Sequence, residues 1–321
     1  MNGTPAQIEI LAPFGAAFDW MKAMLFRPFD LVRWLTIAFA AFISGSWSNG
    51  ANFRWNQWRH GDWNWNYRMH RHGDFYDGSV PAWLIALMVV GVLLAIVLAF
   101  VWAWVTARGR FIFTDCIVKN RAAIAEPWRE YRREGNSYFL FSIVVGFGIV
   151  FLAAIFIMVI VLPLGLFSHR HDVDINFGLA LIPLISFGFI FVLLIVVVAL
   201  ILHLMVPVMY RRRCLAREAF VDVARLIFHN PAPFVVFVLF MIALAIGVAV
   251  VGTVVACATC CIGAFPYIST VLLLPAIVWL AAFRLLFLRQ FGDQYDAWAA
   301  AGGMTAPVTT SPASPPVAPA G

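Results

Sequence analysis

Charge is what this chain has least of, since only 12% of its 321 residues are Asp, Glu, Lys or Arg, while 63% are hydrophobic. The longest stretch without an ionisable side chain other than cysteine and tyrosine runs from Asn230 to Phe283, over 54 residues. A soluble domain does not bury so long an apolar segment, but two membrane-spanning helices and the turn between them use all of it. This composition excludes a disordered or an ordinary soluble protein and predicts an all-α membrane protein.

Three further runs lack charge, namely Ala82–Val105, Tyr138–Phe167 and Phe177–Leu202. Each is long enough to cross roughly 30 Å of hydrocarbon as a helix that rises about 1.5 Å per residue. We therefore predict a polytopic transmembrane helix bundle of about six spans in three hairpins, within a membrane domain at 31–288. The expected spans are Leu31–Trp47, Ala82–Val105, Tyr138–Phe167, Phe177–Met209, Phe234–Ala256 and Tyr267–Leu288. The first is the shortest and contains Arg33, which leaves a five-span alternative open.

The distribution of the basic residues predicts the topology. Residues 1–30 are charged and lack the apolar core of a secretory signal, so insertion should begin with the first span. With both termini in the cytoplasm, seventeen Lys and Arg residues fall inside and five outside, as the positive-inside rule requires. We therefore expect a multi-pass protein of the bacterial cytoplasmic (inner) membrane. The net charge of +6 then indicates topology and contact with anionic lipid headgroups at the cytoplasmic face, and not a nucleic acid partner.

Short amphipathic segments are expected before each hairpin. The first has an apolar stripe of Phe14, Phe18, Met21 and Leu25, and the third has Phe220, Val223 and Ile227. A weaker middle copy opens at Glu126-Pro127 and closes at Gly135-Asn136. Their apolar faces are too short to span, so they should lie in the cytoplasmic interface as parts of a threefold repeat. The alternative is that loops between spans often form amphipathic helices without any repeat.

The remaining segments are too small for a catalytic domain. The outer connection at 48–80 is rich in Trp and His and suits a small hairpin with an aromatic face against the headgroups. The cytoplasmic C-terminal segment at 289–321 becomes an Ala/Pro/Ser/Thr tail from about residue 302, which predicts disorder there.

Histidines provide the candidate metal ligands. His70-Arg71-His72 and His169-Arg170-His171 are near-repeats that the predicted topology places on the outer face, each followed closely by a carboxylate. Imidazole and carboxylate groups together suit a borderline divalent metal, so His70, His72, His169 and His171 are the candidate set. However, an Arg between the histidines repels a cation, and polar loops produce such clusters by chance. Adventitious clustering is therefore favoured over stoichiometric binding, and no cofactor is expected.

Cysteines at the outer end of the fifth span admit two interpretations. Cys257 and Cys260 have redox-motif spacing, and Cys261 lies one turn after Cys257. They also continue two ladders of small residues at four-residue spacing, which would let helices approach closely in lipid. One ladder is Ala245, Ala249, Thr253, Cys257 and Cys261, and the other is Gly252, Ala256, Cys260 and Ala264. Packing is the favoured interpretation.

Ionisable residues inside the spans are few. His203 and Arg284 lie near the cytoplasmic ends of their spans and are expected to snorkel to the interface. No carboxylate falls near mid-bilayer, which argues against a proton or sodium relay. Phosphate-loop, zinc-protease and serine-hydrolase motifs are missing from the sequence. We expect a non-enzymatic scaffold or partner subunit with a membrane protein partner. The alternative is a permease or channel-like component for a small solute or metal ion, for which a cavity between the fourth and sixth spans would speak.

Several motifs carry a resemblance. Residues 257–263, 266–275 and 287–292, with Pro127-Trp128 and Arg211–Ala219, resemble an uncharacterised bacterial multi-pass membrane family. The architecture is also similar to the membrane domain that precedes the catalytic domain of some glycerophosphoryl diester phosphodiesterases. That catalytic domain is missing from this sequence, so the resemblance implies no phosphodiesterase activity and assigns no role to the outer histidines.

Overall fold

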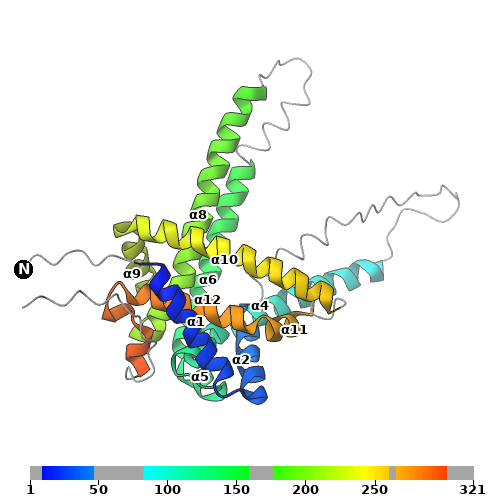
Figure 1. The fold of residues 1–321 in the computed structure, drawn as a ribbon. Helices are drawn as coiled ribbons and strands as arrows, with labels where there is room; N and C mark the ends of the chain where they lie inside the picture. Colours follow the sequence, from blue (N-terminus) through cyan, green and yellow to red (C-terminus); the bar gives the residue numbers. More distant parts are fainter. Residues whose placement is uncertain (1–8, 47–81, 159–176, 260–264, 302–321) are drawn as a thin grey trace, which may run out of the picture.

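The computed structural model describes residues 9–46, 82–158, 177–259 and 265–301, and every regular element in these ranges is a helix (Figure 1). The prediction of an all-α protein is thereby confirmed for this part of the chain. The α-helices are α1 (Leu11–Phe26), α2 (Leu31–Ile43), α4 (Ala82–Val118), α5 (Ala125–Glu130), α6 (Arg132–Phe156), α8 (Phe177–Arg212), α9 (Ala216–His229), α10 (Pro231–Ala258), α11 (Pro266–Leu272) and α12 (Leu274–Arg289). Two 3₁₀ helices follow, η3 (Asp293–Tyr295) and η4 (Ala297–Ala301).

Four of these helices are long and apolar enough to cross a membrane. They contain the segments Trp83–Val118, Arg132–Phe156, Ile185–Arg212 and Pro231–Ala258. These segments overlap the second to fifth spans that the charge-free runs predict. An apolar helix of this length satisfies its backbone hydrogen bonds internally, so its transfer from water into lipid leaves no backbone polar group unpaired. The chain is therefore a membrane protein.

The six-span layout in three hairpins is not confirmed. Helix α2 has 13 residues, which gives a length of about 20 Å and falls short of the hydrocarbon thickness. The expected sixth span is divided at Leu273 into α11, of 7 residues, and α12, of 16 residues. Pro275 lies in the first turn of α12, where its missing N–H costs no helical hydrogen bond. A regular helix that began before Pro275 would lose a backbone hydrogen bond at this residue, so the break at Leu273 suits the proline. The apolar residues of α12 are largely buried against protein. The buried residues are Leu274, Val278, Ala282, Phe283, Leu285, Leu286, Phe287 and Leu288.

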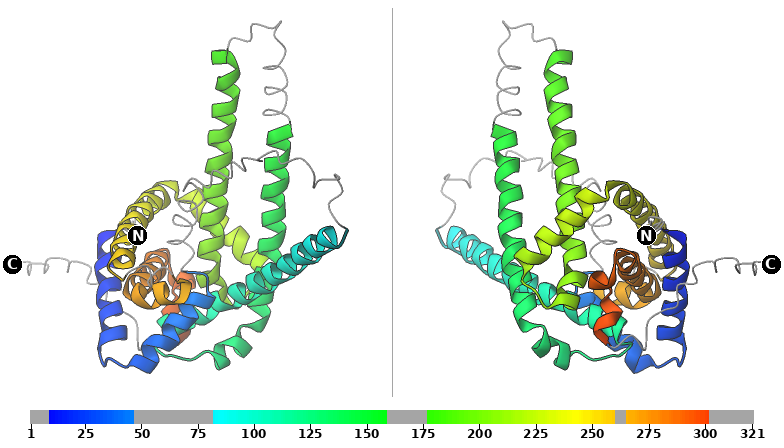
Figure 2. Two further views of the ribbon diagram at one scale, coloured as in Figure 1. Left: turned by 90° about the vertical axis from the view of Figure 1, so that its right-hand side faces the viewer. Right: turned by 90° about the vertical axis from the view of Figure 1, so that its left-hand side faces the viewer.

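The hydrophobic core lies where the ends of the long helices meet the short ones. Helix α1 packs along α12, with the ring centroids of Phe14 and Trp279 4.5 Å apart. The indole N–H of Trp279 donates to the Phe14 carbonyl at 3.1 Å. Trp298 of η4 is fully buried in the same core. Figures 1 and 2 show α6 and α8 rising side by side out of this compact part, while α4 leaves it in another direction. The apolar parts of the four long helices therefore do not pack together as one bundle.

Two of the three expected amphipathic helices are present, but their apolar faces pack on protein. Helix α1 buries Ala17, Met21, Met24 and Leu25, and its Phe18 remains partly exposed. Helix α9 buries Val223 and Ile227 and packs against α8. The middle copy is shorter than expected, because α5 ends at Glu130 and Gly135-Asn136 lies inside α6 instead of closing a helix.

One of the two small-residue ladders in α10 is a packing surface. Gly252 and Ala256 are buried, and a Cβ added to Gly252 would lie 3.3 Å from Leu273 Cδ1. Thr253 and Cys257, from the other ladder, are exposed. The packing interpretation thus holds for Gly252 and Ala256, while Thr253 and Cys257 give it no support. Cys260 and Cys261 lie outside the described residues.

Candidate ligand-binding cavity

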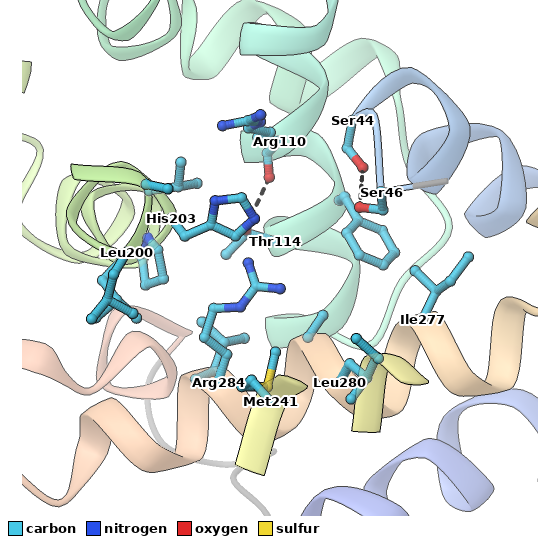
Figure 3. A pocket seen from close by; sticks show the side chains of 18 of the residues that line it. Ser44, Ser46, Arg110, Thr114, Leu200, His203, Met241, Ile277, Leu280 and Arg284 are labelled. Atoms are coloured by element: carbon cyan, nitrogen blue, oxygen red, sulfur yellow. Dashed lines mark hydrogen bonds between the residues drawn. The ribbon is translucent and has the colours of Figure 1, made fainter. Parts of the chain in front are cut away.

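A cavity of about 510 Å³ lies where α4, α8, α10 and α12 meet, with the end of α2 on one side (Figure 3). Its wall is mostly aliphatic and aromatic. On α8 the lining residues Val196, Leu200, His203 and Pro207 recur at three- and four-residue spacing, as one helix face requires. Ile277, Leu280, Ala281 and Arg284 line it from α12 in the same way. The cavity is therefore built mainly by faces of regular helices, and the turn at 44–46 completes one side.

Three basic side chains enter this apolar space from three different helices. Arg110 comes from α4, His203 from α8 and Arg284 from α12. Figure 3 shows them grouped together, with the His203 ring between the two guanidinium groups in that view and the guanidinium of Arg284 directed toward the ring. No Asp or Glu is among the lining residues, which all belong to the described part of the chain. The site carries positive charge without a carboxylate to balance it.

The sequence led us to expect that His203 and Arg284 snorkel to the membrane interface. The structure instead places both in the wall of the cavity, and this corrects that expectation. Snorkelling requires an open path from the helix to the interface, whereas α12 is enclosed by neighbouring helices over most of its length. The polar end of Arg284 has only the cavity to enter.

The polar groups of the cavity differ in how far they are already bonded. Thr114 donates from Oγ1 to the Arg110 carbonyl at 2.8 Å, and Ser44 Oγ lies 2.6 Å from Ser46 Oγ. Arg110 uses its Nη1 on the Tyr138 hydroxyl. Arg284, in contrast, forms no hydrogen bond or ion pair with any residue that the structure describes. Its five N–H donors are thus available to a ligand.

A second arginine on α4, Arg108, is buried and has hydrogen-bond and aromatic partners for its guanidinium, in contrast to Arg284. Arg108 lies over the ring of Trp104 at 4.3 Å and over that of Trp128 at 5.0 Å. Its Nε and Nη2 donate to Asn136 Oδ1 at 3.1 and 2.9 Å. Arg108 therefore holds α4, α5 and α6 together and has a structural role.

Close to the cavity, a buried carboxylate forms an ion network that sequence reasoning missed. Asp115 is fully buried; its Oδ1 accepts from the Tyr210 hydroxyl at 3.0 Å, and Lys119 Nζ lies 2.8 Å from the same oxygen. Its Oδ2 accepts from Arg121 Nε at 3.0 Å. The Tyr131 ring stacks on Tyr210 with centroids 4.9 Å apart, and burial raises the pKa of Tyr131 to about 12. All groups in this network have partners, so it joins α4 to α5 and α8 and is not a binding site.

The candidate metal ligands are not tested by this geometry. His70, His72, His169 and His171 all lie outside the described residues, so their metal binding stays a prediction. Within the described ranges, no group of three or more His, Cys, Asp or Glu side chains is placed to hold a metal ion. Cys116 is buried and its thiol lies 3.5 Å from the Ala123 carbonyl, consistent with a packing role.

Comparison with known proteins gives one match. A family model described as a family of unknown function (DUF7544) matches residues 9–306. No curated protein matches the chain, and no solved structure matches it. The similarity to the membrane domain of glycerophosphoryl diester phosphodiesterases thus finds no support in these comparisons.

Proposed function

Because the chain belongs to the DUF7544 family, whose function is unknown, we propose a role from its own geometry: it is a non-enzymatic scaffold or partner subunit of the bacterial inner membrane. One observation carries this proposal. The apolar stretches of α4 and α6 that are long enough to span are not buried anywhere inside the chain. In a bilayer such surfaces contact lipid or the helices of another membrane protein.

Helix α6 carries the features that favour a protein partner. Phe147 and Phe151 lie one turn apart and are 65% and 66% exposed, so they present one aromatic face outward. Gly146 and Gly148 lie beside them, and a Cβ added to either would meet no atom within 4 Å. Each glycine costs helix stability of up to about 1 kcal/mol relative to alanine, which close packing inside this chain does not explain. Small residues next to large exposed ones suit the close approach of a further helix.

The compact part of the molecule supports the same role, because it fixes where the exposed helices start. Arg108 and the Asp115 network join the inner ends of α4, α6 and α8 to one another. A partner that docks on α6 would therefore meet a helix whose base is held by protein. This arrangement needs no catalytic group and no bound nucleic acid.

Crosslinking from α6 tests the scaffold proposal. A photoreactive phenylalanine analogue at Phe147 should yield an adduct of defined mass with a second membrane protein, identified after purification in mild detergent. Phe156 provides the matched control on the same helix, since its ring stacks on Phe187 of α8 with centroids 5.1 Å apart. The analogue at Phe156 should react within the chain. Adducts with lipid alone from both Phe147 and Phe151 would contradict the proposal.

A permease or channel-like component is the second candidate, and the cavity is the observation that favours it. The cavity is lined by α8, which contains the expected fourth span, and by α12, which contains the larger part of the expected sixth. Since its polar groups are basic, it suits a small anionic solute better than a metal ion.

The proposed topology has both termini in the cytoplasm, and the distribution of seventeen against five basic residues supports it. In a variant without native cysteines, a cysteine at Gly73 should react with a membrane-impermeant maleimide on intact spheroplasts. A cysteine at Arg132, which is exposed at the start of α6, should react only after the membrane is opened. Protection of the cysteine at Gly73 in intact spheroplasts would exclude this topology.

A further inference from the structure

We propose that the cavity binds the phosphate of an anionic amphiphile, of the class to which phospholipids belong, and that Arg284 is its principal contact. This site does not depend on the scaffold role or on transport. It follows from the charge, the wall and the surroundings of the cavity, taken in turn.

The charge of the cavity requires an anion. Arg110 and Arg284 share an apolar space with His203 and with no carboxylate. Like charges in a medium of low polarity repel one another and have lost part of their hydration, and an anion bound between them relieves both costs. Two further arginines of the described chain have polar partners: Arg108 donates to Asn136, and Arg121 pairs with Asp115. Arg284 is distinguished by directing an unbonded guanidinium into a cavity.

The chemistry of the donors favours phosphate. A guanidinium offers parallel N–H groups that match two oxygens of a phosphate, and such charge-assisted pairs are the strongest hydrogen bonds in proteins. Arg110 retains N–H donors beyond the one given to Tyr138, while one ring nitrogen of His203 already bonds to the Ala199 carbonyl. The two guanidinium groups, from α4 and α12, can together donate to a tetrahedral anion.

The size and the wall of the cavity favour an amphiphile over a free anion. A water molecule takes up about 30 Å³ in the liquid, so an inorganic phosphate would fill only a small part of the 510 Å³ present. Most of the rest of the wall is apolar, including Leu200, Met241 and Ile242. These side chains can contact an acyl chain or glycerol backbone but would gain nothing from a hydrated ion.

The surroundings supply such a ligand. Three of the four helices whose apolar lengths fit a bilayer, α4, α8 and α10, line the cavity. Arg110 lies a few residues after the end of the charge-free run of α4, and His203 directly follows the charge-free run of α8. Both residues therefore lie near the depth of the phosphate groups in a leaflet. A lipid would therefore reach Arg284 with its phosphate already at the right level.

Native mass spectrometry of the purified full-length protein in a neutral detergent tests the proposal. We compare phosphatidylglycerol with phosphatidylcholine of identical acyl chains, and we add inorganic phosphate as a competitor. The wild type should retain one phosphatidylglycerol molecule in preference to phosphatidylcholine. Arg284→Gln should weaken that binding about tenfold or more, and Arg284→Lys should restore part of it. Arg217→Gln, at an exposed arginine of α9 outside the cavity, is the matched control and should bind as the wild type does.

Met241→Trp provides an independent arm, because it fills the apolar wall and leaves the three basic groups in place. It should also weaken phosphatidylglycerol binding. If Arg284→Gln melts much lower than the wild type, the binding measured for Met241→Trp tests the site in its place. Equal retention of both lipids, or unchanged binding in the Arg284→Gln and Met241→Trp variants, would overturn the site. Displacement of the lipid by inorganic phosphate at similar concentration would show a free-anion site and overturn the amphiphile.

Discussion

Replacing Gly109 with alanine is expected to destabilise the protein by at least about 3 kcal/mol, the upper end of what overpacking usually costs. Gly109 is buried where α4 passes the end of α2. A Cβ at this position would lie 2.5 Å from Ile43 Cγ2, and 2.7 and 2.8 Å from the carbonyl carbon and oxygen of the same residue. Side chains can rotate away from such a clash, but backbone atoms cannot, so α2 would have to move as a unit. That movement would also displace Ser44 and Ser46 from the wall of the cavity.

Gly91→Ala is the matched control, since it makes the same chemical change in the same helix. A Cβ at Gly91 meets no atom within 4 Å. Alanine should therefore leave stability unchanged or raise it by up to about 1 kcal/mol through its helix propensity. The measurement is the unfolding midpoint in detergent, by intrinsic tryptophan fluorescence. Equal midpoints for the two variants would mean that α2 is not held against α4 at this point.

The close approach at Gly109 also shows where sequence reasoning stops. Charge-free runs placed α4, α6, α8 and α10 correctly, because a long apolar helix is a local property of the chain. Nothing local indicates that Gly109 meets Ile43, since the two are far apart in sequence and the contact depends on how α2 folds back.

The sixth apolar segment, whose role as a span is not confirmed, shows a related limit of the sequence. Hydropathy responds equally to Phe283 and Phe287 whether they face lipid or protein, and in the structure both are fully buried. Pro275 was visible in the sequence, but proline occurs in membrane helices as well as at their starts. The arrangement of neighbouring helices, which no single segment encodes, decides between the two.

The cavity was foreseeable in its residues but not in its geometry. His203 and Arg284 stood out as ionisable groups within apolar helices. Their grouping with Arg110 arises because α4, α8 and α12 present those faces to one another. A usable signal was the lack of any carboxylate close to Arg284 in the sequence, which leaves that cation without a local partner.

Asp115→Asn is expected to cost about 3 kcal/mol of unfolding free energy, the lower end of the range for removing one member of a buried ion pair. The carboxylate is fully buried and faces Lys119 at 2.8 Å and Arg121 at 2.9 Å. Asparagine keeps the volume but removes the negative charge, and its amide hydrogens would point toward N–H groups. Lys119 and Arg121 would keep only their second carboxylates, Glu130 at 3.5 Å and Glu126 at 2.7 Å. Because Lys119 and Arg121 remain 26% and 29% exposed, water compensates them in part, which places the cost at the lower end.

Asp19→Asn is the matched control, because it removes the carboxylate of an exposed ion pair and so shows what the loss of an ion pair costs without burial. Asp19 lies 2.7 Å from Lys22, as close as any pair around Asp115, but its side chain is 75% exposed. Water solvates both partners of an exposed pair almost as well as they solvate each other, so the substitution should hardly move the midpoint of chemical unfolding. The difference between the two variants therefore measures what burial adds to the contacts of a carboxylate with its cationic partners, of which Asp115 has two and Asp19 has one. A midpoint for Asp115→Asn within error of that for Asp19→Asn would mean that water reaches Asp115. The junction of α4, α5 and α8 would then have to be held by the stacked rings of Tyr131 and Tyr210 instead of by charge.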